Sequence, residues 1–194
     1  MAFHSPSEKK PLEKKGESTA LSSSRSFTIE QSRTINEHIV KCQDDSIAGN
    51  IDVYPLLDGE DAFLLDNESE TCLAMHMRYK LPNVVRFFSP DKLDKKNVGG
   101  YKFIGDLTLQ PELLENTYEF RRDSNDKNLF HVQHTTSVHR FVVSRDGSDV
   151  ASYTVAADII EVSMEPSLSD QDVIILLGIV IATCHLLPVL GNSI

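Results

Sequence analysis

Three histidines near the middle of the chain have the residue type and the spacing that could hold a metal ion. On a strand, His131 and His139 would share one face and His134 would lie on the other, because successive side chains alternate. All three could converge on a zinc ion only if the chain bent at Thr135–Thr136. We therefore expect structural histidines and predict no metal site.

The sequence contains no motif that specifies a catalytic centre. GxSxG, HExxH, P-loop and GxGxxG patterns are all absent. Acidic segments such as Asp44–Asp45 and Glu68–Glu70 lack the spacing of an EF-hand calcium loop. Cys42, Cys72 and Cys184 are far apart and form no CxxC pair, which argues against a zinc site or a disulfide framework. We predict no catalytic residue and no cofactor, so an enzyme is the less favoured class.

A lysine-rich segment is the candidate contact for a membrane or a phosphate group. Lys92, Lys95 and Lys96 lie in the sequence DKLDKK, beside Leu93. Aspartates in the same segment dilute their charge, so a solvated loop is the alternative. Over the whole chain 29 acidic residues outnumber 19 basic residues, and the net charge is −10. This balance argues against nucleic acid as a partner, because phosphate binding needs a basic surface.

Short strands must position these residues, because alternating hydrophobicity recurs from Phe27 onward. The segment Thr71–Lys80 alternates between two sets of side chains, which predicts a strand with one face toward a core. The predicted core-facing set is Leu73, Met75, Met77 and Tyr79. His76 falls on the other face, where we expect a surface histidine.

Local signals mark where strands end and turns begin. Asp146 and Gly147 lie between two β-rich runs and predict a hairpin with a type I′ turn, in which both central residues have positive φ. Pro55 indicates an edge strand or the end of a strand. Residues 1–26 are rich in Ser, Lys, Glu and Pro, which predicts a disordered N-terminal leader.

The most apolar stretch of the chain, Val173–Leu190, has no charged residue and allows two interpretations. A helix that is apolar on every side is typical of one that is buried on every side, and Ser167 or Ser169 could cap its start. The stretch is also about long enough to span a bilayer as a tail anchor. His185 and the absence of flanking Lys or Arg weigh against the anchor. We favour a buried C-terminal helix over residues 169–190.

The C-terminal part of the chain resembles the tubby C2-like superfamily. The sequence FVVSRDGSDVASYTV is followed by ADIIEVSMEPSLSDQDVIILLGIVIA, which is similar to the strand, turn, strand and apolar helix of that superfamily. The matching positions are Gly147, Val150, Ala151, Asp158, Val162, Pro166, Asp172 and the run from Val173 onward. The group includes tubby-like proteins, phospholipid scramblases and plant LURP-one-related proteins. The resemblance implies a closed antiparallel β-barrel threaded by the C-terminal helix, together with binding to lipids or membranes.

These observations predict a mainly β protein in which residues 27–194 form one tubby C2-like barrel domain. The expected function is that of a non-enzymatic binding or adaptor module that contacts lipid or a membrane surface. A tail-anchored membrane protein with a cytoplasmic β-domain is the first alternative, and a ligand carrier or enzyme that uses the barrel mouth is the second. Expected partners are membrane lipid or another protein. The N-terminus lacks the apolar core of a secretory signal. We therefore expect an intracellular protein, cytoplasmic or peripheral at a membrane, with a single-pass C-terminal anchor as the alternative.

Overall fold

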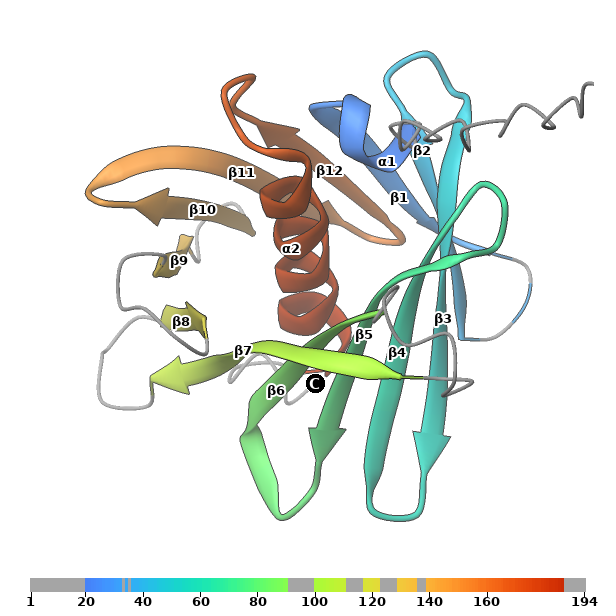
Figure 1. Ribbon diagram of the computed structural model, residues 1–194. Coiled ribbons are helices and arrows are strands. Elements are labelled where there is room, and N and C mark those ends of the chain that lie inside the picture. Colours follow the sequence, from blue (N-terminus) through green and yellow to red (C-terminus); the bar gives the residue numbers. More distant parts are fainter. Residues whose placement is uncertain are drawn as a thin grey trace, which may run out of the picture.

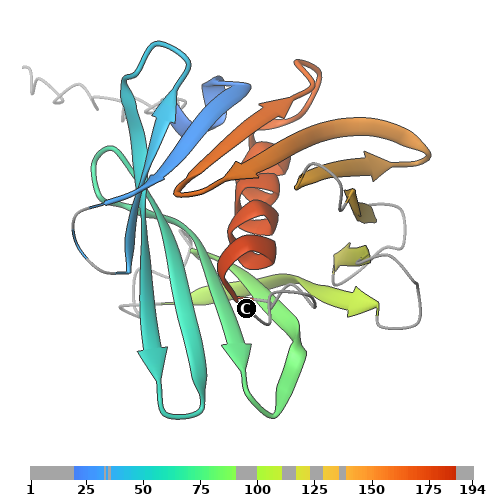
Figure 2. The same ribbon diagram turned by 180° about the vertical axis from the view of Figure 1, so that it is seen from behind.

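The computed structural model describes residues 20–186, except for residues 33, 35, 91–99, 111–116, 123–128 and 136–138. Its strands form a closed barrel in which each strand is antiparallel to its neighbours, and β1 closes the sheet on β12 (Figures 1 and 2). The predicted closed antiparallel β-barrel is therefore confirmed. Closure leaves the described sheet without an open edge, so backbone groups pair within the barrel.

The strands follow the chain in order around the barrel. Their bounds are β1 (Ser26–Gln31), β2 (Glu37–Cys42), β3 (Ile47–Leu56), β4 (Gly59–Asp66), β5 (Thr71–Arg78), β6 (Leu81–Pro90), β7 (Tyr101–Gln110), β8 (Thr117–Arg122), β9 (Phe130–Thr135), β10 (Arg140–Arg145), β11 (Ser148–Ala156) and β12 (Ile159–Met164). The predicted hairpin at Asp146 and Gly147 joins β10 to β11, and both residues have positive φ, 53° and 78°. Pro55 lies beyond the last β2 partner of β3, which is Asp52, as expected for the end of a strand.

The helix α2 (Asp170–Ile181) runs through the barrel and continues as a π-helix over Ala182–Leu186. Ser169 caps its start, because its hydroxyl oxygen accepts a hydrogen bond from the backbone N–H of Asp172 at 3.2 Å. The helix is buried on nearly every side, which confirms the predicted buried C-terminal helix. Residues 187–190 of the predicted span lie outside the described residues.

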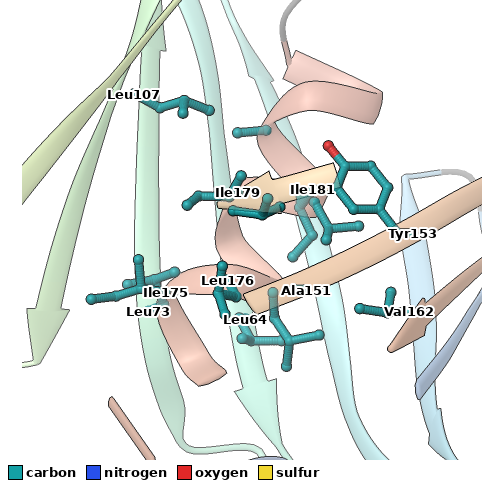
Figure 3. Packing of buried hydrophobic residues seen from close by; sticks show 14 of the residues in the cluster. Leu64, Leu73, Leu107, Ala151, Tyr153, Val162, Ile175, Leu176, Ile179 and Ile181 are labelled. Carbon is teal, nitrogen blue, oxygen red and sulfur yellow. The ribbon is translucent and has the colours of Figure 1, made fainter. Parts of the chain in front are cut away.

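Side chains from the inner faces of many strands surround α2. Ile175, Leu176, Ile179 and Ile181 of the helix pack among them (Figure 3). The strand residues drawn around them are Leu64, Leu73, Leu107, Ala151, Tyr153 and Val162. None of the helices in the described part of the chain is both long enough and apolar enough to cross a bilayer.

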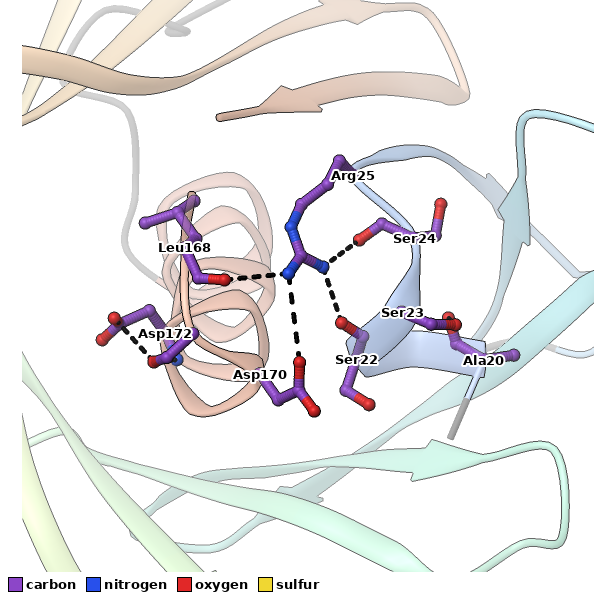
Figure 4. A network of polar contacts seen from close by, with 9 residues as sticks. Ala20, Ser22, Ser23, Ser24, Arg25, Leu168, Asp170 and Asp172 are labelled. Carbon is purple, nitrogen blue, oxygen red and sulfur yellow. Dashed lines mark hydrogen bonds and ion pairs between the residues drawn. The ribbon is translucent and has the colours of Figure 1, made fainter. Parts of the chain in front are cut away.

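The folded part of the chain begins earlier than predicted. A short helix, α1 (Ala20–Ser23), precedes β1, and its Leu21 is fully buried in the core. The Arg25 guanidinium donates hydrogen bonds to the carbonyl oxygens of Ser22 at 2.6 Å and Leu168 at 2.8 Å (Figure 4). Residues 20–26, which we predicted to belong to a disordered leader, are thus tied to the start of α2. Residues 1–19 lie outside the described residues.

A charged cluster holds the first turn of α2 against the barrel wall. The Asp172 carboxylate accepts hydrogen bonds from Arg122 at 2.9 Å and Arg145 at 3.1 Å, and Ser169 donates one at 2.7 Å. Asp172 is buried, so its charge has left water and depends on these partners. The arginines come from β8 and β10, so the cluster joins the helix to two strands.

The close passage of α2 along the wall yields a first prediction. A Cβ atom added at Gly178 would meet Leu73 Cδ2 and lie 2.7 Å from Phe87 Cε1. Overpacking costs about 1–3 kcal/mol, whereas replacing glycine in a helix gains only about 1 kcal/mol. We expect Gly178→Ala to lower the free energy of unfolding in urea, and Gly178→Leu to abolish cooperative folding. A double-mutant cycle with Leu73→Ala should show coupling. A Gly178→Leu variant as stable as the parent would disprove close packing at this position.

The charged cluster yields a second prediction with a built-in control. Asp172→Ala leaves Arg122 and Arg145 without their carboxylate, and we expect a loss of about 3 kcal/mol of unfolding free energy. Asp170 is in the same turn but its side chain is 61% exposed and lies 3.9 Å from Arg25. Asp170→Ala should therefore cost less than about 1 kcal/mol. Equal losses in urea unfolding of the two variants would show that the buried cluster has no special role.

Candidate functional site

The outer surface of β3–β7 carries aromatic side chains across adjacent strands. Strand alternation places them there: Ala62 and Leu64 are buried, so Phe63 between them points outward. We call this group the aromatic face. It consists of Tyr54 on β3, Phe63 on β4, His76 on β5, Phe88 on β6, and Tyr101 and Phe103 on β7.

The rings of the aromatic face touch one another from strand to strand. Phe63 has its ring centroid 5.7 Å from Tyr54 and 6.5 Å from Tyr101. His76 lies edge-on to Phe88 at 4.7 Å, and Phe88 lies 5.6 Å from Phe103. Edge-on contacts at these distances are favourable for aromatic pairs. The result is a continuous apolar strip on the outside of the barrel.

An ion-pair cluster fixes the middle of this strip. The Asp61 carboxylate oxygen Oδ1 lies 2.9 Å from His76 Nδ1 and accepts a hydrogen bond from Arg78 at 2.6 Å. Asp61 is half-buried, and the guanidinium of Arg78 compensates its negative charge. Nearby, the charge of Asp52 raises the pKa of Tyr54, whose phenol donates a hydrogen bond to it at 3.3 Å. A tyrosine is neutral at physiological pH even without this shift, so Tyr54 adds no charge to the strip.

Two hairpins next to this strip end in exposed apolar residues. We call Leu56, Leu57, Tyr79 and Leu81 the hairpin tips; they lie at the β3–β4 and β5–β6 turns. Their exposed fractions are 40%, 105%, 53% and 50%. Both turns project from the same end of the barrel (Figure 1). A large apolar group that stays in water at the end of a hairpin is a candidate contact surface.

The charges around the hairpin tips nearly cancel. Asp58 in the first turn lies 4.0 Å from Arg78 Nε, and Arg78 also pairs with Asp61. Lys80 is exposed in the second turn. Three acidic residues, Asp58, Glu60 and Asp61, and two basic residues, Arg78 and Lys80, thus surround the tips and sum to a charge of −1, whereas the whole chain has a net charge of −10. The surface is apolar with a nearly balanced polar border.

Sequence reasoning did not identify this surface. The candidates Lys92, Lys95 and Lys96 lie outside the described residues, and their predicted role stays a prediction. Leu73, Met75 and Met77 are buried as predicted, but Tyr79 is exposed because β5 ends at Arg78 and the chain turns there. The runs PLLD and RYKL each place apolar residues in a turn, which was the available signal.

The three histidines do not form a metal site in the described residues. His131 is exposed, with Nδ1 3.6 Å from Glu119, whereas His134 points inward and stacks on Phe141 at 4.3 Å. His139, predicted to share a face with His131, instead lies 6.3 Å from His134, because it follows β9 in a turn with positive φ. Burial and His139 lower the pKa of His134. Among the described residues no three potential ligands converge.

A depression of about 510 Å³ lies on the outside of β1, β11 and β12. Its wall is rich in hydroxyl groups and is bordered by Arg140 and Glu161. The hydroxyl residues are Ser26, Thr28, Ser152, Thr154 and Ser163. Open polar walls of this kind are readily solvated, so this depression is a weaker candidate than the apolar tips.

The comparisons with known proteins bear on the fold alone. No family model matches the chain, and no curated protein sequence matches it. Among solved structures, the chain is similar to the X-ray structure of a protein from Arabidopsis thaliana. The two share 13% sequence identity, the match covers 82% of this chain and 91% of that chain, and the TM-score is 0.53. A likeness at this identity shows that the two chains have a similar barrel fold.

Proposed function

We propose that this protein is a non-enzymatic binding module that docks on membrane lipid through the aromatic face and the hairpin tips. One observation carries the proposal: exposed large apolar side chains gather on two neighbouring hairpins. Those residues are Tyr54, Leu56, Leu57, Tyr79 and Leu81. Elsewhere in the described residues the exposed large apolar side chains are Ile47, Tyr101 and Ile159. Such a gathering marks an interaction site more often than a stability device.

The shape of the surface favours a membrane over a peptide. The tips are convex and project from the end of the barrel, so a flat and deformable partner can cover them (Figure 1). A peptide that adds a strand would need a free sheet edge, and the described sheet is closed. Tyrosine combines an apolar ring with a polar hydroxyl, which suits the interface between lipid and water. Tyr54 and Tyr79 lie beside the leucines as this role requires.

The helix weighs against the ligand-carrier and enzyme alternative. Its residues Ile175, Leu177 and Ile179 are fully buried in the barrel interior. The volume that other barrels offer to a small molecule is thus taken up by α2. Binding on the outer surface fits this construction better.

The resemblance to the tubby C2-like superfamily supports the same proposal. The barrel threaded by a C-terminal helix is the architecture that the resemblance implied, and members of that group are associated with lipids or membranes. The adaptor role toward a protein partner is the competing proposal. Binding of the aromatic face to a protein in place of lipid would favour it.

Flotation with vesicles tests the proposal. Vesicles of phosphatidylcholine, phosphatidylethanolamine, phosphatidylserine and phosphatidylinositol are mixed with the full chain, and the bound fraction is measured after centrifugation. We expect the parent to float and Tyr54→Ser/Tyr79→Ser to bind at least about tenfold more weakly, because two interfacial rings are lost. Ile159→Ser, an exposed apolar residue on β12, is the matched control and should bind as the parent does.

Two outcomes would contradict the proposal. If the parent does not float with any of these vesicles, membrane docking is wrong. If the tyrosine variant and the Ile159→Ser control both bind the vesicles as strongly as the parent does, docking occurs through another surface. Circular dichroism and urea unfolding of each variant establish that the barrel is intact before binding is compared.

A further inference from the structure

We propose that the two hairpin tips insert side by side into the hydrocarbon boundary of a charge-neutral phospholipid bilayer, with Leu56 and Leu57 as the inserting pair. This inference rests on the proposed membrane docking and deepens it by naming the inserting residues and the lipid class. This mode of binding differs from binding to anionic headgroups, which would need a basic surface.

The two tips are held together as one rigid unit. The backbone N–H of Tyr79 donates a hydrogen bond to the carbonyl oxygen of Asp58 at 2.9 Å, which joins the turn of one hairpin to the turn of the other. Gly59 allows this approach, because a Cβ atom there would meet the carbonyl oxygen of Met77 in β5. The leucines and Tyr79 are therefore presented together, and little order has to be gained on binding.

The turn at the apex suits insertion. Leu56 pairs with Gly59 across the β3–β4 hairpin, so Leu57 and Asp58 form a two-residue turn. Backbone groups of a tight hairpin are mostly paired, which lowers the cost of bringing them near hydrocarbon. Leu57 at the apex is fully exposed in water and therefore has the most apolar surface to bury.

The border of the tips matches a neutral lipid headgroup. Asp58 pairs with Arg78, so its carboxylate approaches the interface with a partner. Lys80 has a long side chain that can keep its ammonium in the headgroup layer. The charged residues near the tips, Asp58, Glu60, Asp61, Arg78 and Lys80, sum to −1, while the chain as a whole carries −10. An anionic bilayer would repel the bulk of the protein without gaining a basic contact at the tips.

A single tryptophan tests insertion directly, because the chain contains none. Leu57→Trp places the only tryptophan at the apex of the tip. We expect its fluorescence to shift to shorter wavelength with phosphatidylcholine vesicles and to be quenched by brominated acyl chains. Ile47→Trp is the matched control, because Ile47 lies at the other end of the same strand and is 54% exposed. Its emission should not change.

A binding series identifies the lipid class. The parent and Leu56→Asn/Leu57→Asn are compared on vesicles of phosphatidylcholine alone, with added phosphatidylserine, and with added phosphoinositide, at low and high ionic strength. We expect the parent to bind phosphatidylcholine vesicles with little effect of salt. It should bind the two kinds of vesicle with anionic lipid more weakly at low than at high ionic strength, because salt screens the repulsion. The double variant should bind about 100-fold more weakly, because two leucine side chains no longer leave water. Urea unfolding establishes that it folds.

Each remaining outcome identifies what is wrong. Binding that needs anionic lipid and disappears at high salt would overturn insertion into a neutral bilayer but leave membrane docking standing. Binding without a shift of the Leu57→Trp emission would show that another surface touches the bilayer. No binding to any vesicle would refute the proposed function itself. A blue shift without lipid, together with a dimer in analytical ultracentrifugation, would show that a second copy covers the tips.

Discussion

The burial of α2 is the constraint on which the rest of the structure depends. A helix with apolar side chains in all directions needs an apolar surface in all directions, and a closed sheet is one of few arrangements that supply it. Each strand must therefore turn one apolar face inward, as Leu73 and Phe87 do beside Gly178. Gly178 has no side chain, so Leu73 and Phe87 can come close to the helix backbone at this position.

The polar groups near the start of α2 help to fix the position of the buried helix along the barrel axis. An apolar helix inside an apolar wall gains free energy from contacts that have little direction, so contacts alone do not determine its position along the barrel axis. The contacts of Asp172 with Arg122 and Arg145, and that of the Leu168 carbonyl oxygen with Arg25, are directional. A buried hydrogen bond between the Tyr153 and Thr183 hydroxyls, at 2.6 Å, adds a directional contact near the other end of the helix. We infer that they define the register of the helix within the barrel.

Because α2 fills the interior, the surface that we propose for binding lies on the outside of the barrel. Because side chains alternate along a strand, the outward side chains do not contact the core, and most of them are polar in a soluble barrel. The strands β3–β7 depart from this at Phe63, Phe88 and Phe103, and their hairpins depart further at Leu56 and Leu57. Rings that pack on one another outside the barrel stabilise the sheet locally, and they also raise the apolar area near the tips.

The sequence by itself indicated many short strands, the Asp146–Gly147 hairpin and an uncharged apolar helix, because period-2 alternation, turn residues and an apolar run are local signals. The closed barrel was implied only by the resemblance, and the sequence left a membrane anchor as the alternative to a buried helix. It did not determine the start of the domain: Leu21 and Arg25 look like part of a polar leader until the core and the Leu168 carbonyl are in place. Nor did it show the hairpin tips. Leu57 and Tyr79 are separate in the chain, and only strand pairing brings their turns together. Whether an apolar residue at a strand end faces a core or water is decided by where the strand stops, and that is a property of the tertiary structure.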